Sequence, residues 1–254
     1  MRIIGRGFIA RHMTAVGDRH PHVTLLAAGV SSTRVTDPAE FAREAALVKG
    51  ELARAADRGG MVVFLSTASS SLYGVRNEPA REDAEPHPLD GYGQHKLSLE
   101  EEVRTAGADW LILRLSHVVG VGQREHQLFP SLLRQMRSGS VSLHLGASRD
   151  LIDVTDVRTA LDSLLRQKNR NEVVNVASGI LYPMEKVVAG IESRLRVTVH
   201  KNLIQAPPSG TSVSIDKLRR LLPVWPFSFG PDYTERLLDA YTESYEPDTG
   251  RLGK

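Results

Sequence analysis

The chain has 254 residues, 41% hydrophobic and 24% charged, a balance typical of a globular protein that buries a core without covalent cross-links. It contains no cysteine, which excludes disulfides, thiolate metal ligands and cysteine nucleophiles, and we expect no metal site. The formal net charge is only +2, basic and acidic residues are interspersed, and no apolar run is long enough to cross a bilayer. We therefore expect neither nucleic-acid nor membrane binding and, without a recognisable secretory signal, a cytoplasmic location.

Strand-like apolar runs alternate with helical patterns through the first half of the chain. The predicted strands cover residues 1–4, 23–28, 61–66 and 110–115, and the predicted helices cover 8–16, 38–56 and 92–105. This alternation indicates an α/β fold with a parallel sheet between helices. Nearly continuous apolar runs, such as 61–65, are typical of strands that are covered on both faces.

The pattern loosens beyond about residue 120. Helices are predicted near 128–136, 155–166 and 184–195, with short strands near Val141 and Val173. We expect a Rossmann-like core over residues 1–120, on which parts of the second half also pack. A smaller α/β substrate-binding lobe is expected over 121–245 and a flexible tail over 246–254, where polar residues, proline and glycine replace periodic apolar ones.

A glycine-rich turn follows the first predicted strand. The motif G-x-G-x-x-A begins at Gly5, where glycine permits a tight turn, and Gly7 would let the backbone approach a pyrophosphate. Candidate cofactor-binding residues in this turn are Gly5, Arg6, Gly7, Phe8 and Ile9. Arg6 could pair with the 2′-phosphate of NADP or could be a solvated loop residue, and the sequence leaves both readings open.

A serine, a tyrosine and a lysine form the candidate catalytic set. Tyr92 and Lys96 are four residues apart on a predicted helix and therefore share one face. An ammonium group there can lower the pKa of the phenol and hydrogen-bond a cofactor ribose, so that Tyr92 can exchange a proton with a substrate oxygen. Ser69 follows the predicted strand that ends at Ser66 and can donate a hydrogen bond to the same oxygen.

With these motifs the chain resembles the extended short-chain dehydrogenases/reductases, the NAD-dependent epimerase/dehydratase family. The resemblance rests on the glycine turn, the Tyr-x-x-x-Lys motif and segments 25–29, 66–74, 113–120 and 149–157. It implies a Rossmann-like fold, NADP(H) or NAD(H) as cofactor, and cofactor contacts from Ala27, Ala28, Gly29, Lys96 and His117. It also implies substrate contacts from Ser70, Ser71 and Arg149, although Arg149 could instead pair with Asp150 or Asp153.

The chain departs from the family pattern after the glycine turn. Only about 20 residues separate Gly7 from Ala27, whereas full-length relatives insert two further strands with their helices. Those strands carry the acidic residue for the adenosine ribose and the adenine contacts. We therefore expect a sheet that lacks two of the usual strands and a cofactor pocket without its adenine half.

The resemblance implies an NAD(P)-dependent oxidoreductase that acts on a keto- or hydroxy-sugar linked to a nucleoside diphosphate, with ketoreduction as the leading reaction. Epimerase or dehydratase chemistry is the alternative among enzymes, and a non-catalytic nucleotide sensor is the alternative outside them. Dehydratases usually place an acidic residue beside the catalytic serine, but the neighbours of Ser69 are Ala68 and Ser70. We also expect a homodimer formed through helix 38–56 and the Tyr92 helix, as is common in this family.

Overall fold

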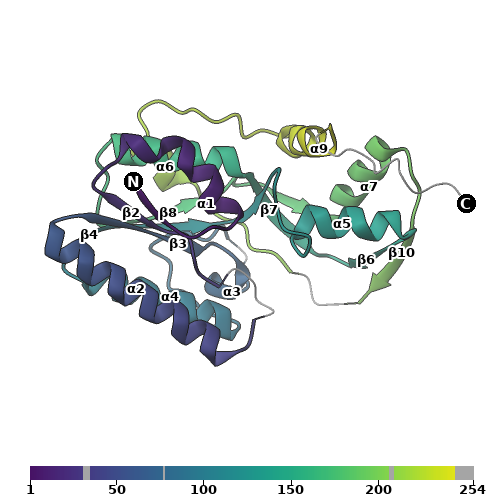
Figure 1. The fold of residues 1–254 in the computed structure, drawn as a ribbon. Coiled ribbons are helices and arrows are strands. Elements are labelled where there is room, and N and C mark those ends of the chain that lie inside the picture. The colour runs from purple at the N-terminus through teal and green to yellow at the C-terminus, as the bar shows by residue number, and fades with distance from the viewer. Residues whose placement is uncertain (31–34, 77, 206–208, 244–254) are drawn as a thin grey trace, which may run out of the picture.

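The computed structural model describes residues 1–30, 35–76, 78–205 and 209–243, which form two lobes joined by short strands (Figure 1). The tail expected over 246–254 lies outside the described residues. Within those ranges no helix is long and apolar enough to cross a bilayer. The described side chains also contain no group of three or more His, Cys, Asp and Glu that could hold a metal ion.

The larger lobe is built on a five-stranded parallel sheet. Its strands are β1 (Arg2–Ile4), β2 (Val23–Leu26), β3 (Met61–Thr67), β4 (Asp109–Leu115) and β8 (Glu172–Val176), in the spatial order β1-β2-β3-β4-β8. The registers are parallel throughout, for example Ile3 opposite Leu25 and Phe64 opposite Ile112. Among the described strands none pairs with the outer side of β1. The prediction of a Rossmann-like sheet that lacks strands at this edge is therefore confirmed.

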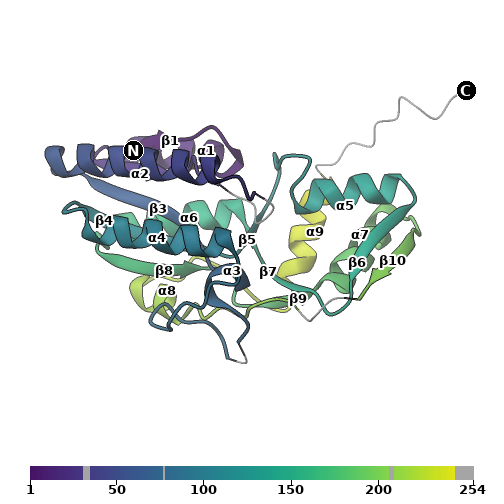
Figure 2. The ribbon, with the colours of Figure 1, turned by 90° about the horizontal axis from the view of Figure 1, so that it is seen from below.

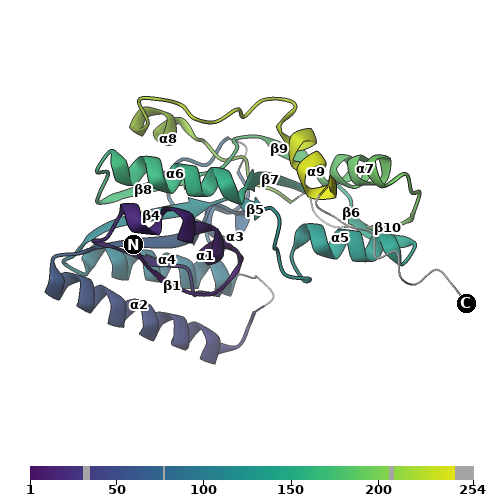
Figure 3. The same ribbon diagram turned by 45° about the horizontal axis from the view of Figure 1, so that its top comes forward.

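Helices cover both faces of this sheet (Figure 2, Figure 3). One face packs against α1 (Phe8–Met13), the short 3₁₀ turn Thr14–Arg19, α6 (Val154–Arg166) and α8 (Asp216–Leu221). The other packs against α2 (Pro38–Arg58) and α4 (Gly91–Thr105). Burial of aliphatic side chains on both sides explains why β2 and β3 are nearly continuous apolar runs.

The smaller lobe has its own apolar core. It contains α5 (Leu128–Arg137), α7 (Met184–Leu195), α9 (Tyr233–Glu243) and the parallel strand pair β6 (Ser140–His144) and β10 (His200–Ile204). A three-stranded sheet of β5 (His117–Val119), β7 (Ser148–Asp153) and β9 (Leu181–Pro183) lies between the lobes. Because α6, β8 and α8 return to the larger lobe, the chain crosses between lobes more than once, and a boundary at residue 120 remains a prediction.

Local capping fixes the two helices that carry the candidate site. Helix α2 begins after Asp37, whose carboxylate accepts a hydrogen bond from the Ala39 amide, and it ends at Gly59 in the left-handed conformation. Helix α4 begins after Asp90, which accepts a hydrogen bond from the Gly93 amide over 2.8 Å. Both helix starts therefore follow from residues that the sequence places directly before the helical pattern.

Candidate active site

The carboxyl end of β3 brings Ser69 and Tyr92 to one hydroxyl group. Ser69 is the N-cap residue of α3 (Ser70–Tyr73), and the Thr67 hydroxyl donates to Ser69 Oγ over 2.9 Å. The Thr67 hydroxyl also lies within hydrogen-bonding reach of the Tyr92 phenol, which comes from the first turn of α4, and it lowers the pKa of that phenol. Sequence reasoning missed Thr67, although it ends the strand and belongs to the same serine- and threonine-rich run.

Close packing of α4 on α3 sets the position of Tyr92. A Cβ atom on Gly93 would lie 1.8 Å from the Ser71 carbonyl oxygen, so this position accepts only glycine without a backbone shift. The Ser71 hydroxyl donates to Asp90 Oδ2 over 2.8 Å, and Asp90 in turn caps α4. Ser71, expected as a substrate contact, therefore uses its hydroxyl to join α3 to the start of α4, whereas substrate binding by Ser70 stays a prediction.

Lys96 forms a buried ion pair with Glu44 of α2. Lys96 Nζ lies 2.7 Å from Glu44 Oε1, and the two side chains are 4% and 3% exposed. Glu44 Oε2 also accepts from the Val30 amide over 2.8 Å and lies 3.0 Å from His95 Nε2. Burial alone would raise the pKa of Glu44, but the Lys96 charge and these hydrogen bonds hold it below its ordinary value.

Glu44 was not predicted, although a signal for it exists in the sequence. It falls on the apolar face of α2 together with Val48, Leu52 and Ala55, where a charged residue requires a partner. The Glu44 carboxylate and the Lys96 ammonium occupy the space beside Gly29. A Cβ atom at Gly29 would lie 2.0 Å from Glu44 Oε1 and 2.9 Å from Lys96 Nζ. Gly29, expected as a cofactor contact, is thus required by this ion pair.

The pKa of Tyr92 is shifted in the direction opposite to the expected one. Burial raises the pKa of Tyr92 above its ordinary value, and the negative charge of Glu44 adds to the increase. The Thr67 hydrogen bond acts in the opposite direction, and Asp90 raises the pKa further. Lys96 was expected to lower this pKa, but its ammonium is paired with Glu44, which offsets its charge at the phenol.

The glycine turn and the end of β2 form the candidate cofactor site. Gly5 has φ of +133°, and a Cβ atom there would lie 2.3 Å from the Ala27 carbonyl oxygen, so β1 and β2 approach closely only because residue 5 is glycine. No atom lies within 4 Å of a Cβ built on Gly7, which leaves open space beside the turn. Arg6 is exposed and makes no ion pair within the described residues.

These residues fit one half of a dinucleotide better than the other. The open turn at Gly7 can accept a pyrophosphate, and Tyr92 lies beside the ends of the central strands, where a nicotinamide ring would have to lie for reaction. The sheet, however, ends at β1 in the described part of the chain, so the strands that carry adenine contacts in a full Rossmann fold have no counterpart there.

His117 and Arg149 lie on neighbouring strands between the lobes. His117 of β5 is opposite Leu151 of β7, and Arg149 shares the face of Leu151 because it is two residues away. Desolvation and the positive charge of Arg149 lower the pKa of His117, whose side chain keeps contact with solvent. His117 is therefore neutral at pH 7, and the positive charge on this face comes from Arg149.

Arg149 makes no ion pair with Asp150 or Asp153, so that alternative is wrong for the described structure. Its guanidinium donates to the Ser148 carbonyl oxygen over 2.7 Å and to Ser209 Oγ over 3.3 Å. Asp150 accepts instead from the Ser178 and Gly179 amides, and Asp153 caps α6. Arg149 thus keeps a half-buried positive charge without a carboxylate among the described residues.

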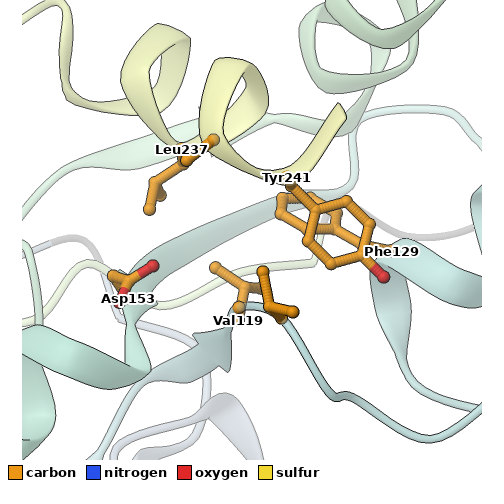
Figure 4. A pocket seen from close by; sticks show the side chains of 8 residues that line it. Val119, Phe129, Asp153, Leu237 and Tyr241 are labelled. Carbon is orange, nitrogen blue, oxygen red and sulfur yellow. The ribbon is translucent and has the colours of Figure 1, made fainter. Parts of the chain in front are cut away.

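A small, mostly apolar pocket opens where the lobes meet (Figure 4). Its labelled side chains come from β5, α5, the end of β7 and α9, and they are Val119, Phe129, Asp153, Leu237 and Tyr241. The rings of Phe129 and Tyr241 pack with centroids 4.7 Å apart. Since none of Ser69, Tyr92 and Lys96 lines it, this pocket is a packing gap beneath α9 and not part of the candidate active site.

Two curated proteins are similar in sequence to this chain. Over 137 residues, 48% of this chain and 45% of the relative, the sequence is 34% identical to GDP-6-deoxy-D-mannose reductase of Pseudomonas aeruginosa. Over 170 residues, 63% of this chain and 54% of the relative, it is 29% identical to the uncharacterised UDP-glucose epimerase YtcB of Bacillus subtilis. The matched regions therefore span about half the length of these curated relatives.

Solved structures show the same fold. The structure of RMD from Pseudomonas aeruginosa complexed with NADPH superposes with a TM-score of 0.77 at 22% identity, covering 95% of this chain and 98% of that one. UDP-glucuronic acid 4-epimerase from Bacillus cereus, in complex with UDP-glucuronic acid and NAD, gives a TM-score of 0.74 at 23% identity, covering 92% and 79%. Residues 9–177 match the model of the NAD dependent epimerase/dehydratase family, and this chain belongs to that family.

Proposed function

We propose that this protein is an NAD(P)-dependent oxidoreductase that reduces a keto-sugar carried by a nucleoside diphosphate. The observation that carries the proposal is the arrangement of Ser69 and Tyr92 around the Thr67 hydroxyl, with Lys96 one turn further along α4. Family membership supports the reaction class, and the reductase from Pseudomonas aeruginosa supports the direction.

In this proposal each residue acts on one atom of the substrate. Reduced nicotinamide, when bound, would supply the hydride that the carbonyl carbon gains. Tyr92 donates its phenolic proton to the carbonyl oxygen, and Ser69 donates a hydrogen bond to the same oxygen. Lys96 would hold the nicotinamide ribose, and the glycine turn with Ala27 and Ala28 would accept the pyrophosphate.

Arg149 is the proposed contact for the substrate diphosphate. Burial lowers the pKa of Arg149, as expected for a guanidinium that has lost water without gaining a carboxylate. A diphosphate is a suitable anion because its oxygens match the planar donors of arginine. His117, neutral beside Arg149, would contribute a hydrogen bond without adding charge.

The proposal is tested by cofactor binding and turnover of the purified protein. Titration with NADPH and NADH by fluorescence should show binding, and UDP-, GDP- and dTDP-linked 4-keto-sugars should be reduced, as followed by loss of NAD(P)H absorbance. Tyr92→Phe should retain the fold and lower turnover by about 100-fold or more, the scale for losing a positioned general acid. Tyr241→Phe, the same change on α9 of the smaller lobe, is the matched control and should leave turnover unchanged.

Other results would assign a different function. Epimerisation without net consumption of NAD(P)H, detected by NMR of the sugar, would make the protein an epimerase. Absence of any cofactor binding would favour a non-catalytic nucleotide sensor. Unchanged turnover in Tyr92→Phe would remove Tyr92 from the mechanism.

We also infer a homodimer that forms through α2 and α4. Ala42, Ala46, Gly50 and Ala53 are exposed along one side of α2 and would permit close helix packing. Light scattering at micromolar concentration should show twice the monomer mass, and Ala46→Arg should reduce it to that of a monomer. A monomeric wild-type protein would contradict this inference.

The cytoplasmic location also stays a prediction, which cell fractionation would test.

A further inference from the structure

The candidate general acid lies beside a buried ion pair. Lys96 Nζ lies 5.8 Å from the Tyr92 ring centroid, close enough for its charge to stabilise a tyrosinate. The ammonium, however, is 2.7 Å from Glu44 Oε1, and both side chains are almost fully buried. The net charge of this pair is zero.

Several independent contacts hold the Glu44 carboxylate where it is. The Val30 amide donates to Oε2 over 2.8 Å, and His95 Nε2 lies 3.0 Å from the same oxygen. The His95 ring packs on Phe41 of α2 with centroids 4.6 Å apart. Gly29 leaves the space that the carboxylate fills. Contacts from three segments of the chain therefore fix the position of the Glu44 carboxylate.

We propose that Glu44 is a positioning residue that neutralises Lys96 beside Tyr92 and thereby keeps Tyr92 in its protonated form, ready to donate a proton to a keto-sugar. This inference rests on the proposed function. Reduction starts from a protonated phenol, whereas oxidation, the first step of epimerases and dehydratases, starts from a tyrosinate that accepts the hydroxyl proton.

The proton balance of the two directions shows why the charge matters. In reduction, the carbonyl carbon gains a hydride, the oxygen gains the Tyr92 proton, and the tyrosinate takes a proton back from water. In oxidation, tyrosinate must exist before substrate reacts, and the buried carboxylate of Glu44 disfavours that anion. The other groups that act on the phenol are Asp90, which has the same sign of effect as Glu44, and the Thr67 hydroxyl, which opposes it.

The direct test is a titration of Tyr92 without cofactor or substrate. Tyrosinate absorbance is followed after a rapid pH jump in wild type, Glu44→Gln, and each of these combined with Tyr92→Phe, which isolates Tyr92 from the other five tyrosines. Glu44→Gln should shift the Tyr92 titration to lower pH by about one unit or more, a tenfold change in the tyrosinate fraction. An unshifted midpoint would overturn the inference.

A matched control lies on the same helix. Glu51 is also 3% exposed on α2 and pairs with Arg2 and Arg54, away from the site. Glu51→Gln should leave the Tyr92 titration unchanged. If Glu44→Gln shifts the midpoint and Glu51→Gln does not, the effect belongs to the carboxylate beside Lys96. An equal shift in both variants would overturn the inference by assigning the effect to loss of helix packing.

A double variant covers the case in which Glu44→Gln does not fold. Glu44→Gln with Lys96→Met leaves no unpaired charge, and exchange of a buried ion pair for neutral groups is often tolerated. Because the wild-type pair is already neutral, the Tyr92 midpoint should stay in place or fall. A rise would show that Lys96 lowers the pKa of Tyr92 in the wild type and would overturn the inference.

The catalytic consequence is measured separately. In Glu44→Gln the alkaline limb of the pH profile of kcat/KM for reduction, where Tyr92 loses its proton, should move to lower pH by about one unit, in line with the titration shift. An unmoved alkaline limb would overturn the inference even if the protein is a reductase. Failure of wild type to reduce any nucleotide sugar would reject the proposed function, while the titration alone would still report whether Glu44 controls Tyr92.

Discussion

Helix α4 carries two buried ion pairs one turn apart, and their surroundings differ. Glu100 is fully buried and binds Arg114 of β4 through two hydrogen bonds of 2.7 and 2.9 Å. It also accepts from Ser66 of β3 over 2.6 Å. The Lys96 ion pair has a single hydrogen bond to Glu44 and lies beside the Tyr92 ring.

The Glu100 cluster has a structural role, whereas the Glu44 cluster lies at the candidate active site. The Arg114 guanidinium also donates to the Tyr73 hydroxyl, which in turn donates to Asn175 of β8, so the Glu100 cluster connects α4, α3 and three strands. No candidate catalytic group belongs to it. The Glu44 cluster connects only α2, α4 and the segment after β2, but it sets the charge beside Tyr92. The two carboxylates therefore have different roles because Glu100 contacts structural groups and Glu44 lies beside Lys96 and Tyr92.

The largest expected effect comes from breaking the structural ion pair. Glu100→Gln leaves Arg114 buried without its counter-charge, and loss of one partner of a buried pair costs about 3–5 kcal/mol of unfolding free energy. Urea denaturation followed by circular dichroism measures the change. The Tyr92 titration of the folded fraction should not move. A loss below about 1 kcal/mol would show that water or another acceptor compensates Arg114, and the structural reading would fail.

The next largest effect is expected from Gly93→Ala, which tests whether α4 must pack closely on α3. Gly93→Ala places a Cβ atom against the Ser71 carbonyl, and the required backbone shift should cost about 1–3 kcal/mol of stability. Displacement of Tyr92 by about 1 Å should lower turnover by on the order of 100-fold. The control is Gly50→Ala, at a helical position without neighbours within 4 Å in the protomer, where alanine is small enough for the inferred dimer contact and should stabilise the protein slightly. Normal turnover in Gly93→Ala would contradict the packing argument.

The fold and the catalytic set follow from local sequence patterns, whereas the charge environment does not. Strand periodicity, the glycine turn and the Tyr-x-x-x-Lys spacing each involve residues close in the chain, so they can be read from the sequence. Glu44 and Lys96 are 52 residues apart and meet only when α2 and α4 pack on one face of the sheet. For that reason the sequence predicted a lysine acting alone on Tyr92.

A similar limit applies to hydroxyl groups. Ser69 and Ser71 are in one serine-rich run, and the sequence assigns both to the site. Ser71 instead binds Asp90, 19 residues later, while Thr67 joins Ser69 to Tyr92. Composition shows where hydroxyls are abundant, but the hydrogen-bond partner of each one depends on how α3 and α4 pack.

The difference in affinity between NADPH and NADH tests whether Arg6 binds the cofactor at the sheet edge that lacks adenine-binding strands. Arg6 is exposed on the glycine turn and is the candidate partner for the 2′-phosphate of NADPH. If it makes that contact, NADPH should bind more tightly than NADH by about 1–3 kcal/mol, the range for a charged hydrogen bond. Calorimetric titration of both cofactors measures this difference, and Arg6→Ala should remove most of it without abolishing binding. Equal affinities in wild type would reject the Arg6 assignment.

The smallest effect concerns a third ion pair, which joins the same two helices at the surface. Lys49 of α2 and Glu102 of α4 lie 3.0 Å apart, but their side chains are 60% and 44% exposed. Water and dissolved ions screen such a pair, so Lys49→Ala should cost less than about 1 kcal/mol, and the cost should shrink further at high salt. Urea denaturation at low and high ionic strength checks both statements. A larger or salt-independent cost would mean that the outer contact between α2 and α4 also holds Glu44 against Lys96, and the Tyr92 titration of Lys49→Ala would then shift as well.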